Sequence, residues 1–96
     1  MNYLSEIAGR IKDAVPPAVR PEAPADELFR IYACLALALG TGVKASDIHN
    51  AWAAWMAGKD PNHPALVPFR DLDPETQSED EPFLLAVRKV AASLQL

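Results

Sequence analysis

The chain is poor in cysteine and in basic residues, and it contains no long apolar run. Its one cysteine, Cys34, excludes an internal disulfide, and the first residues lack the basic and apolar regions of a signal peptide, so we expect a cytoplasmic protein. Nine Lys and Arg against thirteen Asp and Glu give a net charge of −4, which argues against nucleic acid as a partner. The longest apolar run, residues 31–39, is far shorter than the roughly 20 residues of a membrane span, so none is expected.

What is present predicts one small all-α domain over residues 1–96. Half of the residues are hydrophobic, which suffices for a single modest core, and nine prolines fall in two clusters that interrupt any regular element. Between the clusters, apolar residues recur every three or four positions, and no segment alternates as a half-buried strand would. We predict four main helices, a Pro-rich linker over residues 16–25 between the first two, and a long Pro-rich crossing loop over residues 59–72.

The first two helices have different apolar patterns. The first stops before Pro16 and has its apolar residues on one face, which predicts an amphipathic helix at the periphery. The second is predicted from an N-cap at Asp26 to Leu39, with Gly40 as the residue that ends it. It is apolar on nearly every side, so we place it in the middle of the fold and expect the Cys34 thiol to be buried there.

The third helix is predicted over residues 44–57 and carries both tryptophans. Trp52 and Trp55 share a broad apolar face, with His49 on its shoulder, so the two indoles are expected to anchor the core. If Trp52 is buried in this way, replacing it by alanine should cost about 3 to 5 kcal/mol.

Two proline positions predict the helical segments beyond the crossing loop. Asp73 followed by Pro74 is typical of an N-cap and the first helical residue, so a short helical turn should extend to about Ser78. Pro82 can open the last helix, whose apolar residues again recur at helical spacing.

A family resemblance rests on the order of motifs in residues 45–94. Ile48-His49-Asn50-Ala51-Trp52 is followed by His63-Pro64-Ala65-Leu66-Val67-Pro68-Phe69, then by an acidic stretch and an apolar helix. This order resembles the RyR domain, a repeat of ryanodine receptor channels that also occurs as a small protein in bacteria and phages. The resemblance implies a compact, mainly helical and non-catalytic module, which in bacteria would sense a nucleotide-like small molecule.

The chain departs from the family pattern at two places. Residues 53–62 are shorter than the insert that the family usually carries before its His-Pro motif. Glu81 stands where the family often has an arginine, so the resemblance implies no positive contact to an anionic ligand at that position.

The leading hypothesis is a small-molecule cleft between the third helix and the crossing loop. His49 and Trp52 would form one wall and His63 the other, since two imidazoles and an indole at a junction of helix and loop give the mixture of polar and apolar groups that ligand pockets favour. The alternative is structural: both imidazoles would then hold the loop against the helix by hydrogen bonds.

Other site chemistries find no support in the sequence. No His or Cys pair has the spacing of a metal site, so neither a metal nor another cofactor is predicted. Gly40-Thr41-Gly42 lacks the lysine and the spacing of a phosphate-binding loop. No nucleophile with a matching base is apparent, and we therefore expect that the protein is not an enzyme.

The acidic stretch supports the rival hypothesis of a protein-interaction factor. Residues 71–81 hold six acidic and no basic residues, which predicts a solvated acidic face. Through Glu79, Asp80 and Glu81, helped by exposed Leu85 and Leu96, that face would dock on a host or partner protein. The 17 alanines and nine prolines indicate a phage or a GC-rich bacterium as the source. The sequence leaves the oligomeric state open.

Overall fold

The computed structural model describes residues 2–21 and 24–94, and in these ranges the protein is helical without any strand. The all-α class is therefore confirmed. Four long helices, one short helix and three 3-10 turns follow one another along the chain: α1 (Tyr3–Ala14), η1 (Pro17–Val19), α2 (Asp26–Leu39), η2 (Gly40–Gly42), α3 (Ala45–Lys59), η3 (Phe69–Asp71), α4 (Pro74–Ser78) and α5 (Glu81–Ser93).

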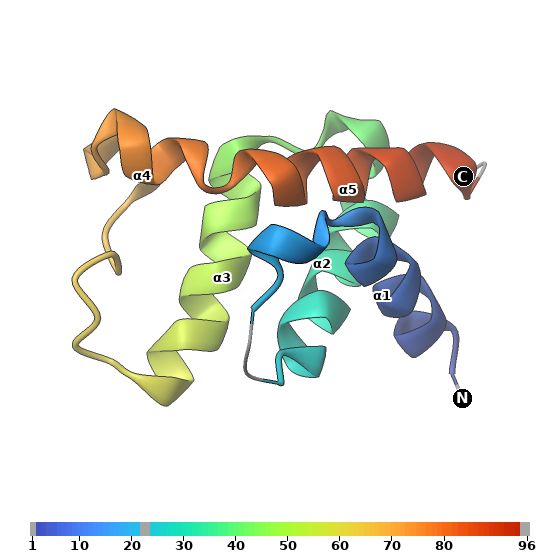
Figure 1. Ribbon diagram of the computed structural model, residues 1–96, viewed down its shortest axis with the longest axis horizontal. Helices are drawn as coiled ribbons and strands as arrows, with labels where there is room; N and C mark the ends of the chain where they lie inside the picture. Colours follow the sequence, from blue (N-terminus) through green and yellow to red (C-terminus); the bar gives the residue numbers. More distant parts are fainter. Residues whose placement is uncertain (1, 22–23, 95–96) are drawn as a thin grey trace.

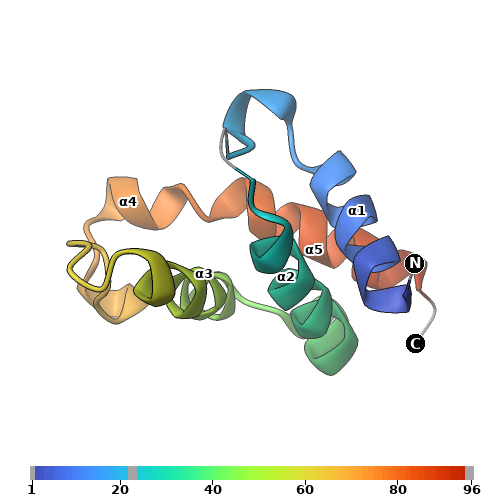
Figure 2. The ribbon, with the colours of Figure 1, turned by 90° about the horizontal axis from the view of Figure 1, so that it is seen from below.

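Helix α2 lies between α1 and α3, and α5 runs across all three (Figures 1 and 2). Helix α4 continues the line of α5 beyond α3, so the crossing loop leaves the far end of α3 and returns to α4 on one side of the molecule (Figure 1). None of the helices in the described part of the chain has both the length and the apolar character needed to cross a membrane.

Local signals set most of the helix ends. The Asp73 carboxylate accepts a 2.7 Å hydrogen bond from the amide of Thr76, which caps α4 as predicted and lowers the pKa of Asp73. Gly40 ends α2 with a φ of 59°, a conformation that glycine adopts without strain. Asp26 is not the N-cap of α2: Ala25 occupies that position, and Asp26 lies in the first turn, where its charge favours the helix dipole.

The core is built from α1, α2, α3 and α5. Its fully buried side chains are Ile11 and Val15 near the end of α1, Leu28 and Tyr32 in α2, Val43 and Ile48 around the start of α3, and Val87 in α5. Helix α1 lies at the edge of the fold, as predicted, and it contributes one apolar face to the interior, where it packs against both α2 and α5 (Figures 1 and 2).

Helix α2 is central, as predicted, but it keeps one outer face. Cys34 is exposed, and so is Leu39 at 45%. Phe29, Tyr32, Ala33 and Ala36 are the residues that face the core, and Cys34 lies two positions from Tyr32, about 200° around the helix. The expected burial of the thiol was wrong because no element covers that side of an otherwise apolar helix.

Both tryptophans lie at the edge of the core rather than in it. Trp52 and Trp55 are partly buried and pack against the buried cluster from one side only. The prediction that the indoles anchor the core was wrong. The apolar residues of α3 that are buried in the core are Ile48 and Ala51. The other side of the two indoles faces a cavity.

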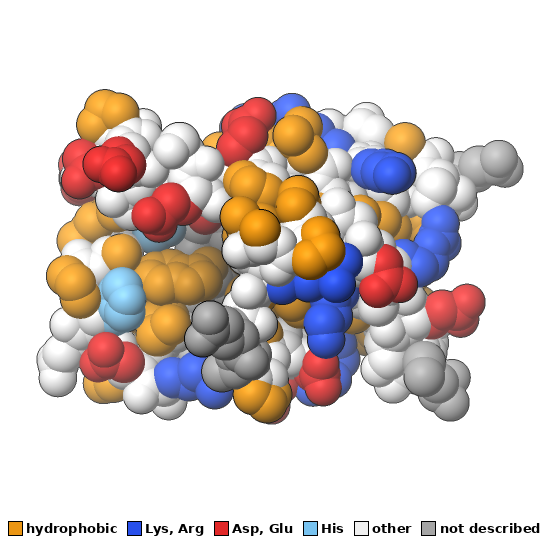
Figure 3. Space-filling view, viewed as in Figure 1, with side chains coloured by type: hydrophobic (Ala, Val, Ile, Leu, Met, Phe, Trp, Pro, Cys, Tyr) orange, Lys and Arg blue, Asp and Glu red, His pale blue; other side chains and the backbone are white. Residues whose placement is uncertain are grey.

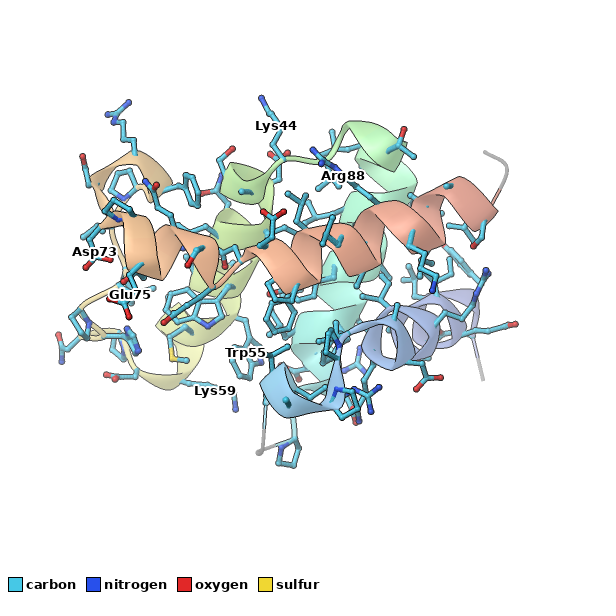
Figure 4. The ribbon with its side chains drawn as sticks, turned by 45° about the horizontal axis from the view of Figure 1, so that its top comes forward. Lys44, Trp55, Lys59, Asp73, Glu75 and Arg88 are labelled. Atoms are coloured by element: carbon cyan, nitrogen blue, oxygen red, sulfur yellow. The ribbon has the colours of Figure 1, made fainter. Side chains whose placement is uncertain are left out.

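Side-chain hydrogen bonds to backbone carbonyls hold the connections in place. Arg20 donates from Nε to the carbonyl of Val15 at 3.0 Å, which holds the described part of the Pro-rich linker against the end of α1. Arg88 of α5 donates from Nε to the carbonyl of Val43 at 2.9 Å, next to Lys44 at the start of α3 (Figure 4). The second bond ties α5 to the turn between α2 and α3.

Candidate functional site

A cavity of about 430 Å³ lies where α2, α3, α4, the start of α5 and the crossing loop meet. The aromatic side chains Tyr32, Trp52, Trp55 and Phe83 line it, and Glu79 and Asp80 supply its carboxylates. Figure 3 shows this hollow as an apolar floor, bordered by acidic side chains and a histidine. Its volume falls in the range of small-molecule sites.

His49 is buried between the cavity and the crossing loop. Only 3% of the residue is exposed, and its Nε2 lies 2.7 Å from the carbonyl oxygen of Val67. Because a carbonyl oxygen only accepts hydrogen bonds, Nε2 carries a proton and donates it to Val67. The imidazole also stacks on Trp52, with 5.6 Å between ring centroids and 25° between planes.

His63 belongs to the crossing loop and also contacts Trp52. Its Nδ1 accepts a 3.0 Å hydrogen bond from the amide of Ala65, and its ring meets the edge of the Trp52 indole at 5.0 Å and 81°. The structure therefore brings His49, Trp52 and His63 together around one indole. Only the hydrogen bond of His49 joins the helix to the loop, since that of His63 lies within the loop, and all three side chains line the cavity.

Tyr32 and Asp80 also line the cavity, and the sequence analysis did not place them there. Tyr32 reaches the cavity from α2; it is 2% exposed, and burial, followed by the charge of Asp80, raises the pKa of its phenol. Asp80 precedes α5 but does not cap it by a side-chain hydrogen bond. Its position two residues before Pro82 is the only sequence signal for it, and that signal indicates a helix start rather than a pocket.

Asp80 does not belong to a solvated acidic face. Burial, then repulsion from Glu79, raises the pKa of its half-buried carboxyl to about 6, although the nearby His49 acts in the opposite direction. Glu79 is exposed but borders the cavity, and Glu81 is exposed outside it. Of the three residues predicted to form a docking face, two thus line the cavity. Leu85 is exposed at 55% as expected, and Leu96 lies outside the described residues.

The described residues contain no group of three or more His, Cys, Asp or Glu side chains that could hold a metal ion. The His and acidic residues that line the cavity are His49, His63, Glu79 and Asp80.

Comparison with known families places the whole helical unit in one family. The model of a domain of unknown function, DUF7701, matches residues 2–92. The chain belongs to the DUF7701 family. A search of curated proteins gave no match, and a search of solved structures gave none either. The match includes α1, so the first helix is part of the DUF7701 domain, and the resemblance to the RyR domain stays a prediction.

Replacing Trp52 by alanine in this DUF7701 domain should lower the free energy of unfolding by about 1 to 2 kcal/mol. This is less than a core indole would cost, because one side of Trp52 already faces the cavity. The comparison variant is Ile48→Ala in the same helix, where a smaller but fully buried side chain should cost about 3 kcal/mol. Urea unfolding of both variants measures the order, and a larger loss for Trp52→Ala would contradict the placement of the indole.

Replacing Asp80 by asparagine should stabilise the DUF7701 domain at neutral pH. Since the pKa of Asp80 is about 6 when folded and 3.8 as an ordinary aspartate, the unfolded chain loses this proton first, and stability falls as the pH rises between these values. The shift corresponds to about 3 kcal/mol, which partial exposure and solvent screening reduce to about 1 kcal/mol. Asp80→Asn should therefore gain about 1 kcal/mol near pH 7.5 and nothing near pH 4.

The groups that face Asp80 determine how this result is interpreted. His49 of α3, Tyr32 of α2 and Glu79 beside it surround the carboxyl, so the matched control is Glu81→Gln, which removes the same charge outside the cavity. Urea unfolding at the two pH values should leave Glu81→Gln close to the unmodified protein at both. An equal gain in the two variants would assign the effect to net charge and not to burial.

Proposed function

We propose that this domain is a non-enzymatic binding module whose cavity takes a small organic molecule with a flat or apolar part. The observation that carries the proposal is the cavity itself, which has a volume of about 430 Å³ and is lined by four aromatic side chains and two imidazoles. Tyr32 lines this cavity from α2 although only 2% of the residue is exposed, so its side chain lies between the core and the cavity.

The cavity wall supports binding rather than catalysis. Both imidazoles are engaged by the backbone of the crossing loop, which holds them as fixed parts of the wall. The thiol of Cys34 is exposed on α2 and does not line this cavity. The aromatic rings offer a large, rigid contact area for a flat ligand, in keeping with a receptor pocket.

A nucleotide-like ligand fits only in one orientation. The residues that line the cavity include Glu79 and Asp80 and no Lys or Arg, so a phosphate inside it would meet negative charge without compensation. A base could stack against Trp52, with its phosphates directed out to solvent. The rival function, docking through an acidic face, is less well supported because Asp80 turns toward the cavity and removes one of the three charges from that face.

The test is thermal unfolding of the full chain against a panel of bases, nucleosides, nucleotides, aromatic amines and quaternary ammonium compounds. A ligand at 100 times its dissociation constant adds about 2.7 kcal/mol of stability, which raises the midpoint of a domain this small by roughly 10 to 20 °C. Trp52→Ala should remove the rise, whereas Leu85→Ala, on the exposed side of α5, should keep it. A panel without any rise would overturn the proposed function.

A further inference from the structure

We infer that the ligand of this cavity is an organic cation, an ammonium or quaternary amine on a small apolar body, bound between the aromatic walls with Asp80 as its counter-charge. The inference rests on the proposed function and adds the chemical class of the ligand. It follows from the aromatic wall, from the charges of the residues that line the cavity and from the position of Tyr32 near Asp80.

The aromatic wall surrounds the cavity from several elements. Tyr32 comes from α2, Trp52 and Trp55 from α3, and Phe83 from α5, and the ring of Tyr32 lies 5.9 Å from that of Phe83. The faces of such rings carry negative electrostatic potential and attract cations, most strongly where water is excluded. A cavity with four aromatic residues from three helices is therefore suited to a positively charged group.

Trp55 already binds a cation within the molecule. The ammonium group of Lys59 lies 4.9 Å from the centroid of the Trp55 ring at the end of α3 (Figure 4). Lys59 does not line the cavity, so this contact uses the indole from outside. It shows that the environment of Trp55 accepts an ammonium in this fold.

The charged side chains that line the cavity have one sign. They are Glu79 and Asp80, and no Lys or Arg stands among the described lining residues. Burial disfavours the charged form of Asp80, as its raised pKa indicates. At neutral pH the folded protein therefore holds this carboxylate at a cost in free energy. A cation in the cavity removes this cost by pairing with the carboxylate, and an anion increases it.

Tyr32 gives the second polar contact. Only 2% of the residue is exposed, and it lines the cavity from α2. The phenol oxygen can accept a hydrogen bond from a protonated amine or contact the methyl groups of a quaternary one. Asp80 and Tyr32 thus offer an anion and an acceptor to the same ligand, in a cavity that is otherwise mainly apolar.

The test compares three probes of similar size that differ in charge: phenyltrimethylammonium, the neutral tert-butylbenzene and benzoate. Titration of the full chain, followed by NMR of the tryptophan indole N–H signals, gives the three affinities. The cation should bind about ten-fold more tightly than the neutral probe, and benzoate should be the weakest. The charge of phenyltrimethylammonium does not change with pH, so its affinity should fall between pH 8 and pH 5 as Asp80 is protonated. The other titratable residues that line the cavity are His49, His63 and Glu79.

Matched variants assign the effect to Asp80. Asp80→Asn should weaken phenyltrimethylammonium about ten-fold and leave tert-butylbenzene unchanged, whereas Glu81→Gln should change neither affinity more than about two-fold. Equal binding of the cation and the neutral probe, tighter binding of benzoate, or equal effects of the two variants would overturn the inference while the proposed function stands. If no probe binds and only neutral or anionic compounds of the panel do, the inference is likewise overturned while the proposed function stands. Failure of every compound overturns both.

Discussion

Replacing Ile11 by alanine should lower the free energy of unfolding by about 3 to 4 kcal/mol, a large part of the stability of so small a domain. Ile11 is completely buried near the end of α1, and this helix packs against both α2 and α5. The substitution removes three methyl or methylene carbons from a close-packed interior and leaves a cavity that neighbouring helices on two sides cannot both close.

The matched control for this prediction is Lys12→Ala, on the exposed side of the same helix. It should change stability by less than about 0.5 kcal/mol, since it removes no buried contact. Urea unfolding followed by circular dichroism measures both variants. Equal effects would mean that α1 does not pack as the structure has it and that the core lies in α2, α3 and α5 alone.

The role of α1 shows what an apolar pattern can and cannot predict. The spacing of its apolar residues gave the buried face correctly, because Ile7, Ala8, Ile11 and Val15 are all buried. The pattern does not say how many elements cover that face. Here α2 and α5 both do, so the apolar face of this peripheral helix belongs to the core while its polar side stays exposed.

In α2 and α3, by contrast, the apolar pattern predicted more burial than the structure has. Cys34 was expected to be buried and is exposed, because an apolar side chain reaches the core only where another element covers it. Trp52 and Trp55 lie on the apolar arc of α3, as predicted, but that arc is wider than the surface that α2 and α5 cover. The uncovered part of the arc became the wall of the cavity.

The candidate site was predictable only where its parts are close in sequence. His49, Trp52 and His63 come from one helix and the loop that follows it, and the spacing of their motifs was enough to expect them together. Tyr32 and Asp80 come from α2 and from the start of α5. Only the packing of those helices around α3 brings them to the cavity, and helical periodicity carries no information about that packing.

Replacing His49 by alanine should lower the free energy of unfolding by about 2 to 4 kcal/mol and loosen the crossing loop. The substitution removes the donor to the carbonyl of Val67 and the ring that packs between Trp52 and Phe69. A partly buried carbonyl without its partner and a space in place of the imidazole both favour the unfolded state. His49→Gln is the control, since its amide can still donate, and it should recover part of the loss.

The loop has a second tether, which makes the effect of His49 distinguishable from general destabilisation. Gln77 of α4 donates from Nε2 to the carbonyl of Phe69 at 2.9 Å, so α3 and α4 each hold one point of the loop. Amide hydrogen exchange should therefore rise in His49→Ala for Asp71 and Leu72, whose amides bond within the loop, while amides of α2 follow global stability. Adding Gln77→Ala should raise loop exchange more than the sum of the single effects, because either tether alone limits opening. Exchange at the loop that stays at the unmodified rate in the double variant would show that the loop is held by its prolines and not by these two side chains.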